Sequence, residues 1–114
     1  QHYGLHYIKA AIYMALGNYS KFTDSLQTVI RFGEQNYGLS KKRIGDDIIK
    51  LLNSREAEHI QSESWNELVP RISILLSLTD DDLYDRIKSE QAKISRTVNT
   101  MLEIANLVKK SRNY

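Results

Sequence analysis

The sequence predicts an all-α fold of about five helices, and three observations predict it. Apolar side chains recur at intervals of three and four residues through most of the chain. One Pro and 5 Gly among 114 residues provide few of the turns that a many-stranded sheet requires. The breaks around Gly17 and Gly38 separate long periodic segments. The length is that of a single domain, in which we expect a helical hairpin over 1–36, middle helices over 39–78 and a long C-terminal helix over 79–112.

The first helix is predicted over 5–16, and it is apolar almost all round. Leu5, Ile8 and Ile12 follow helical spacing, tyrosine, alanine and methionine occupy the other faces, and one lysine is the only charge. Such a helix is buried on more than one side, so it is either the central helix of the bundle or a helix whose covering neighbour is absent from this sequence. Because the sequence starts at Gln1 rather than Met, we expect a piece of a longer protein.

The second helix is predicted from the residues that can start it and the residues that can end it. Gly17 suits the left-handed end of the first helix, and Asn18 or Ser20 can cap the next one. The apolar spacing then continues to about Phe32, and Gly33 and the segment Asn36-Tyr37-Gly38 are expected to break the helix after it.

The middle of the chain contains two more helices with an uncertain connection. Ser40 predicts the start of the third helix, which is expected to end near Asn53. Residues 55–63 are polar and fit either a continued helix or a loop. Ser64, with Glu67 three residues later, forms the pattern of a capping box and predicts the start of the fourth helix.

Pro70 interrupts the apolar stripe of this fourth helix. A proline inside a helix removes a hydrogen bond and clashes with the preceding turn. It therefore predicts either a kink at this point or a helix that begins near Pro70.

The last helix is predicted to be the longest. Thr79 can cap it, three aspartates occupy its first turn, and basic residues lie near its end, which complements the helix dipole. About thirty residues of helix reach far beyond the others, so part of it is expected to project and is the segment through which a homo-oligomer would form. The apolar residues that follow a near-heptad spacing are Leu83, Ile87, Ile94, Val98, Met101, Ala105 and Val108.

The first hairpin, over about 3–33, resembles one unit of the tetratricopeptide repeat family. The residues that carry the resemblance are Ala10, Tyr13, the turn Gly17-Asn18-Tyr19 and Leu26. Phe22 and Val29 depart from the pattern, because the family has small residues at these positions. The resemblance implies the end of a helical-repeat array that holds protein partners.

Few residues suggest catalysis or metal binding, and we expect no enzyme activity, cofactor or metal. The chain has no cysteine, and His2 and His6 lack a third ligand nearby. The acidic cluster 80–85 lacks the spacing of a calcium loop. Glu56 and Glu58 lie in a polar stretch with nothing to raise a carboxyl pKa.

The function that we expect is noncatalytic protein–protein interaction, as an adaptor, scaffold or regulatory module. Aromatic side chains dominate the energetics of interfaces, although core packing is the competing explanation for each of them. No apolar run is long enough to span a bilayer, so we expect a soluble, cytoplasmic protein. The candidate partner-binding residues are Tyr3, Tyr7, Tyr13 and Trp65.

Two alternatives remain open. A helical nucleic-acid-associated subunit would use the basic clusters, although 16 Lys and Arg against 14 Asp and Glu is near balance. The segment around His6, with Lys9 three residues later, resembles a histidine phosphotransfer domain and implies phosphorylation of His6. The basic residues of the first alternative are Lys41, Lys42, Arg43, Lys109, Lys110 and Arg112.

Overall fold

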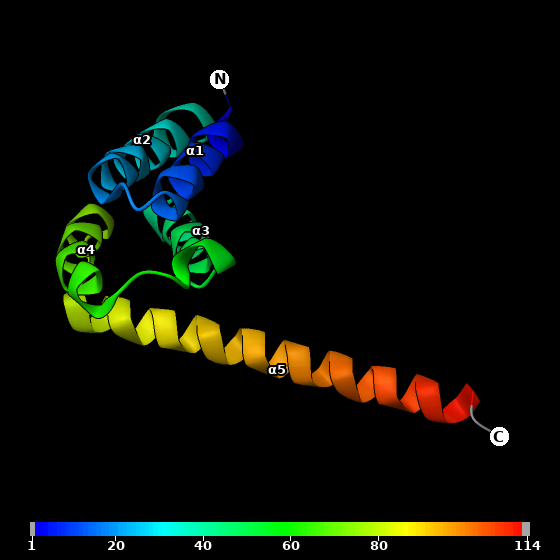
Figure 1. Cartoon of the computed structure of the whole chain (residues 1–114). Coiled ribbons are helices and arrows are strands. Elements are labelled where there is room, and N and C mark those ends of the chain that lie inside the picture. Colours follow the sequence, from blue (N-terminus) through cyan, green and yellow to red (C-terminus); the bar gives the residue numbers. More distant parts are fainter. Residues whose placement is uncertain (1, 113–114) are drawn as a thin grey trace.

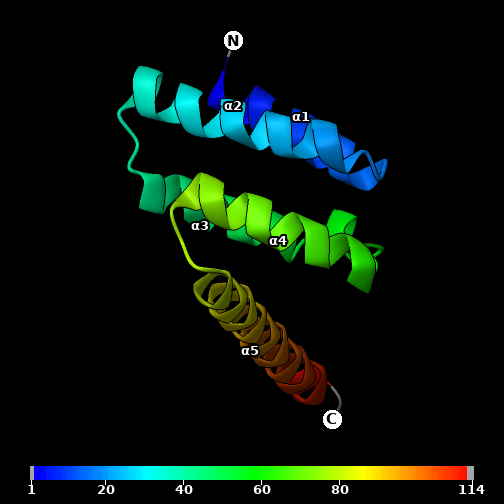
Figure 2. The same cartoon turned by 90° about the vertical axis from the view of Figure 1, so that its left-hand side faces the viewer.

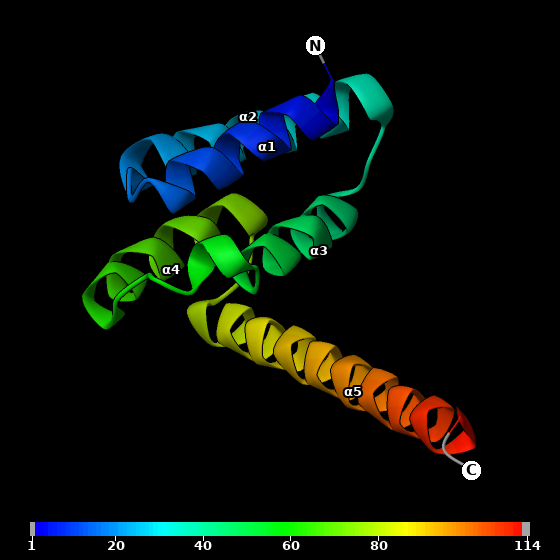
Figure 3. The same ribbon diagram turned by 45° about the vertical axis from the view of Figure 1, so that its right-hand side comes forward.

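The computed structural model describes residues 2–112, and within them the chain forms five α-helices and one short 3₁₀ turn. The predicted all-α fold is confirmed. The helices are stacked in three tiers (Figures 1 and 2). A hairpin of α1 (Tyr3–Ala15) and α2 (Tyr19–Tyr37) forms the first tier, and α3 (Lys41–Leu52) and α4 (Ser62–Leu76) form the second. Helix α5 (Asp80–Arg112) crosses beneath them and extends outward, as Figure 3 shows from another side.

The turn of the hairpin forms as its residues predict. Gly17 has a φ of +75°, in the left-handed region that glycine adopts without strain. The side-chain oxygen of Asn18 accepts a hydrogen bond from the Lys21 amide at 3.2 Å and so caps α2. Ala10 and Met14 of α1 are fully buried, because their side of the helix faces the interior.

Helix α2 does not end near Phe32, so the early end at Gly33 is wrong, whereas the predicted break at Gly38 is confirmed. It continues to Tyr37, and Gly38 closes it with a φ of +61°. Gly33 serves packing instead. A Cβ atom at this position would lie 2.9 Å from Cδ1 of Ile44 and 3.1 Å from Cε2 of Tyr3, so glycine allows α1 and α3 to come close to α2.

The third helix begins and ends where predicted. The Ser40 hydroxyl oxygen accepts a hydrogen bond from the Arg43 amide at 3.1 Å. At the other end, the Asn53 side chain donates to the carbonyl oxygens of Ile49 and Ile87, both at 3.1 Å, and so ties α3 to α5. Most of the open segment 55–63 is a connection: a 3₁₀ turn, η1 (Arg55–Ala57), leads to a short loop, and residues 62–63 already belong to α4.

Helix α4 begins earlier than the capping-box pattern predicts. Its N-cap is Gln61, which makes no side-chain capping bond, and Ser64 and Glu67 lie inside the helix. Pro70 also lies inside it, so a helix start near Pro70 is wrong. The carbonyl that loses its partner at this proline belongs to Asn66, which is exposed, and water can therefore replace the missing donor.

Replacing Pro70 with Ala is expected to stabilise the protein by about 2 kcal/mol. The substitution restores one helical hydrogen bond and removes the ring clash, and the extra freedom of the unfolded chain offsets part of this gain. Urea unfolding followed by circular dichroism measures the change. A loss of stability would contradict this expectation and show that α4 is more stable with proline at this position.

Helix α5 begins at the predicted cap, where the Thr79 hydroxyl oxygen accepts from the Asp82 amide at 3.1 Å. Leu83 is fully buried and Ile87 packs against the core. Every side chain that the structure describes from Gln91 to Ser111 is exposed. The prediction that part of this helix projects is therefore confirmed.

The core is one cluster contributed mainly by α2, α3 and α4. Helix α1 is not its central helix, so this alternative is wrong. Leu5, Ile8, Ile12 and Leu16 are 54%, 56%, 53% and 73% exposed. The side of α1 that faces the core carries Ala10, Met14 and partly buried tyrosines instead.

Candidate interaction surfaces

Two of the predicted partner-binding tyrosines point inward and connect α1 to α3. The hydroxyl of Tyr3 donates to a carboxylate oxygen of Asp47 at 2.9 Å, and the hydroxyl of Tyr7 donates to the Asp47 backbone oxygen at 2.9 Å. The guanidinium Nε of Arg43 lies 3.8 Å from the same carboxylate. These hydroxyls thus serve to hold the hairpin on the second tier.

The surroundings of both hydroxyls keep them protonated. Burial, reinforced by the hydrogen bond to Asp47, raises the pKa of Tyr3 well above its usual range. Burial, with the nearby charges of Asp47 and Glu56, raises the pKa of Tyr7 to about 12. Both remain hydrogen-bond donors throughout the neutral range.

Stability is therefore expected to fall in strong alkali. A raised tyrosine pKa means that folding favours the neutral hydroxyl, so this contribution is complete below pH 10 and is lost as the pH rises through about 12. After allowance for partial exposure, we expect the two groups to contribute about 1 kcal/mol. Urea unfolding at pH 9 and pH 11.5 measures the loss. A Tyr3→Phe, Tyr7→Phe variant should lose less between these pH values, and an equal loss would contradict the assignment.

The other two predicted aromatic residues are half-buried. The ammonium of Lys21 lies 5.6 Å from the ring centre of Tyr13, in a cation–π arrangement. Trp65 packs against the core where α4 meets α5. It lines a hollow beside Tyr84 and a larger groove of about 480 Å³ beside η1. Part of Trp65 is thus accessible along α5.

Four exposed apolar residues follow one another at helical spacing along α1 and its C-cap, and we call them the α1 face: Leu5, Ile8, Ile12 and, at the C-cap, Leu16. A shallow hollow of about 380 Å³ lies among Leu5, Ile8 and Ile12, and His6 and Lys9 also line it. The sequence left open whether this stripe is central in the bundle or lacks its covering neighbour, and the structure leaves it exposed. One feature of the sequence distinguishes the buried side of α1 from the exposed side. The buried side carries tyrosines, whose hydroxyls can form hydrogen bonds with α3.

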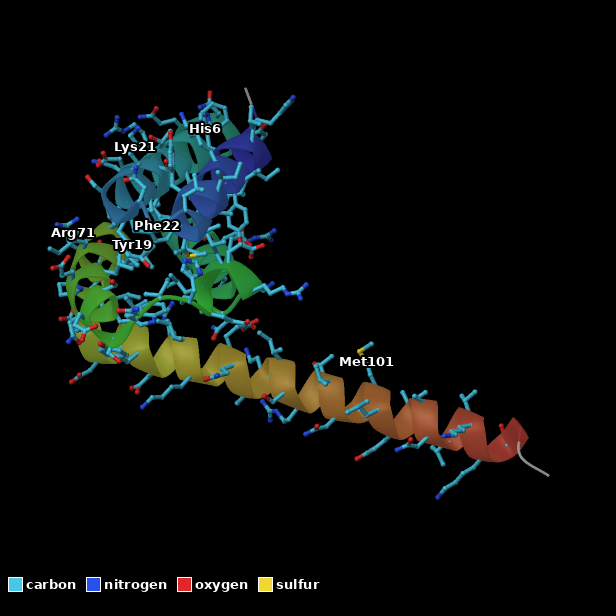
Figure 4. The ribbon with its side chains drawn as sticks, viewed as in Figure 1. His6, Tyr19, Lys21, Phe22, Arg71 and Met101 are labelled. Carbon is cyan, nitrogen blue, oxygen red and sulfur yellow. The ribbon has the colours of Figure 1, made fainter. Side chains whose placement is uncertain are left out.

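A second apolar surface follows the projecting part of α5. We call it the α5 stripe. Met101 is 64% exposed and lies far from the other helices in Figure 4. The stripe consists of Ile94, Val98, Met101, Leu102, Ile104, Leu107 and Val108.

The two predicted basic clusters lie on different parts of the molecule. Lys41, Lys42 and Arg43 are exposed at the start of α3, while Lys109 and Lys110 lie near the far end of α5. Lys109 is 16 residues beyond Lys93, about 24 Å along the helix. Of Arg112 the structure describes the backbone, as the last residue of α5, and not the side chain.

A different basic group forms where α3 meets α5. Lys42 and Lys50 line a groove of about 330 Å³ together with Arg86 and Lys93, and Asp46 and Glu90 lie in the same groove. Arg86 and Lys93 were missed in the sequence. Their spacing of seven residues places them on one side of α5, but which helix faces that side is a tertiary property.

His6 is half-buried on α1, with its ring centre 4.8 Å from that of Phe32. Glu56 is fully exposed, and hydrogen bonds from its own backbone amide and from Ser54 lower its carboxyl pKa, whereas a general acid needs a raised one. Within residues 2–112, no three His, Asp or Glu side chains are placed to hold a metal ion. None of the described helices has the length and apolar composition needed to cross a bilayer.

Comparison with known proteins gives no relative for this chain: no protein-family model matches it, and neither does any curated protein or solved structure.

Proposed function

We propose that this chain is a noncatalytic protein-interaction module, of the adaptor, scaffold or regulatory kind, that binds an amphipathic helix of another protein on the α1 face. The observation that carries the proposal is the exposure of four large aliphatic side chains on one side of α1, each more than half accessible. Contiguous apolar surface of this kind is typical of interaction sites.

The spacing of the α1 face supports a helix as the bound element. Leu5, Ile8, Ile12 and Leu16 follow one another at intervals of three, four and four residues, so they form a straight ridge along α1. Helices pack by placing such ridges in the grooves of a neighbour. Fully burying one aliphatic side chain contributes about 1.5–3 kcal/mol, so covering four half-exposed ones contributes roughly 3–6 kcal/mol.

The rigidity of the hairpin also supports this function. The two tyrosine hydroxyls hold α1 against Asp47 of α3, so the α1 face is presented on a fixed helix rather than a loose one. A preorganised surface loses less entropy on binding.

Site-specific photocrosslinking in the source cells tests the proposal. A photoreactive residue at Ile8 should give a small number of discrete protein adducts, and the same probe at Thr28, which is exposed on α2, should not. Adding Leu5→Asp should abolish the adducts, because it places a charge on the α1 face without affecting the core. Identical adducts from Ile8 and Thr28, or adducts insensitive to Leu5→Asp, would contradict it.

A second candidate, association with nucleic acid, is favoured by the four basic side chains in the groove between α3 and α5. Phosphate contacts of this kind weaken steeply as salt is added. Binding of RNA or DNA at low salt that is lost with Lys42→Glu and Lys93→Glu would support it. If neither RNA nor DNA binds at 20 mM salt, association with nucleic acid is contradicted.

A further inference from the structure

The distal half of α5 has the pattern of a coiled-coil helix that lacks its neighbour. The apolar residues at alternating intervals of four and three occupy what would be the a and d positions of a heptad repeat. They continue from Ile87, which packs against the core seven residues before the first of them. The a and d residues of the exposed half are Ile94, Val98, Met101, Ala105 and Val108.

The charges of this segment lie away from those positions. Arg96, Glu103 and Lys110 recur every seven residues on the opposite side of the helix. Leu102 and Ile104 flank the a and d residues and widen the apolar surface. Between Ile94 and Val108, the side that a neighbouring helix would cover thus carries no charge.

We propose that the neighbour is the same segment of a second copy of this chain, running antiparallel, so that two molecules form a symmetric dimer through α5. This inference rests on the proposed role in protein interaction and names one partner. An identical helix fits because the a and d positions of one copy can face the d and a positions of the other along the whole exposed segment.

The position of the globular part favours the antiparallel direction. Leu83 and Ile87, at the proximal end of α5, are covered by the protein's own core. A parallel partner would have to place its own globular part at this same end, whereas an antiparallel partner places it at the opposite end. The view in Figure 1 shows α5 leaving the other helices in a single direction, which makes the far end accessible.

One register uses the whole exposed segment. It places Val98 of each copy opposite Met101 of the other, Ile94 opposite Ala105, and Gln91 opposite Val108. Val108 then reaches the groove of about 480 Å³ that Trp65 lines beside η1. The interface would bury about 1,200 Å² in total, at the lower end of the range for stable complexes, so we expect dissociation in the micromolar range.

Cysteine crosslinking tests direction and register together, because the chain has no native cysteine. We expect the Gln91→Cys and Val108→Cys variants to form a disulfide-linked dimer when mixed and mildly oxidised. Each variant alone should stay monomeric on a non-reducing gel, since its two cysteines would be about 26 Å apart along the helices. Dimers from each variant alone would show a parallel pair and overturn the proposal, as would no crosslink in the mixture.

Sedimentation equilibrium between 5 and 200 μM tests the association itself. The natural sequence should dimerise, and Met101→Glu should weaken the dimer by at least about 100-fold, because it buries an unpaired charge in each copy. The matched control, Glu103→Gln, alters the opposite side of α5 and should leave the dimer intact. A chain that is monomeric at 200 μM would overturn the proposed dimer. The photocrosslinking test of the α1 face does not depend on this result, so a failure of the dimer can be distinguished from a failure of the proposed function.

Discussion

Replacing Phe22 with Ala is expected to lower the free energy of unfolding by about 3–5 kcal/mol. Phe22 is fully buried and lies on the side of the hairpin that faces the second tier (Figure 4). Removing a buried aromatic ring costs its transfer free energy and leaves a cavity that the neighbours fill only in part. Since small domains are stable by about 5–15 kcal/mol, this single substitution would remove a large part of the total.

Urea unfolding followed by circular dichroism gives the stability of both variants. The matched control is Leu16→Ala in the same hairpin, which removes a side chain that is 73% exposed and should change stability by less than about 0.5 kcal/mol. A Phe22→Ala variant as stable as the natural sequence would contradict the burial of this ring in the core.

Replacing Leu83 with Ala is expected to cost about 2–5 kcal/mol and to loosen the attachment of α5. Leu83 is the side chain of α5 that is fully buried among the described residues, so it is the main apolar contact between this helix and the rest. The loss again combines the transfer free energy with an unfilled cavity. Urea unfolding measures the stability change.

Trp65 provides a local signal for the same variant, because it is the single tryptophan and lies beside Ile87 and Tyr84. Its fluorescence should shift to longer wavelength in Leu83→Ala under native conditions, as water reaches the ring. The matched control is Leu107→Ala on the same helix, 66% exposed, which should leave both stability and fluorescence unchanged. Equal effects of the two substitutions would show that α5 is not held at Leu83.

Several helix boundaries could be predicted because they depend on neighbouring residues alone. Asn18, Ser40 and Thr79 each cap a helix through a hydrogen bond to an amide three residues later. The two incorrect boundaries have a common cause. Gly33 and the Ser64–Glu67 pattern are also local signals, but packing on the core determines how far α2 and α4 extend. Core packing carries α2 through the weak break at Gly33, and it lets α4 begin before Ser64 without a side-chain cap.

The candidate surfaces were only partly predictable. The α5 stripe was visible in the heptad spacing, since a helix that extends beyond its own domain exposes whatever its sequence carries. The basic groove was not visible, because Lys42 and Lys50 meet Arg86 and Lys93 only when α3 crosses α5. No pattern within one helix specifies which other helix will lie against it.

The sequence by itself determined the class of fold, most helix boundaries and the long uncharged surface near the C-terminus, because periodicity and capping act within a few residues. Tertiary structure alone decided which side of α1 is buried. Both sides are apolar, so hydrophobicity does not distinguish them. The tyrosine side is inside because Tyr3 and Tyr7 find acceptors on Asp47 of α3, 44 and 40 residues away, and this leaves the α1 face in contact with solvent.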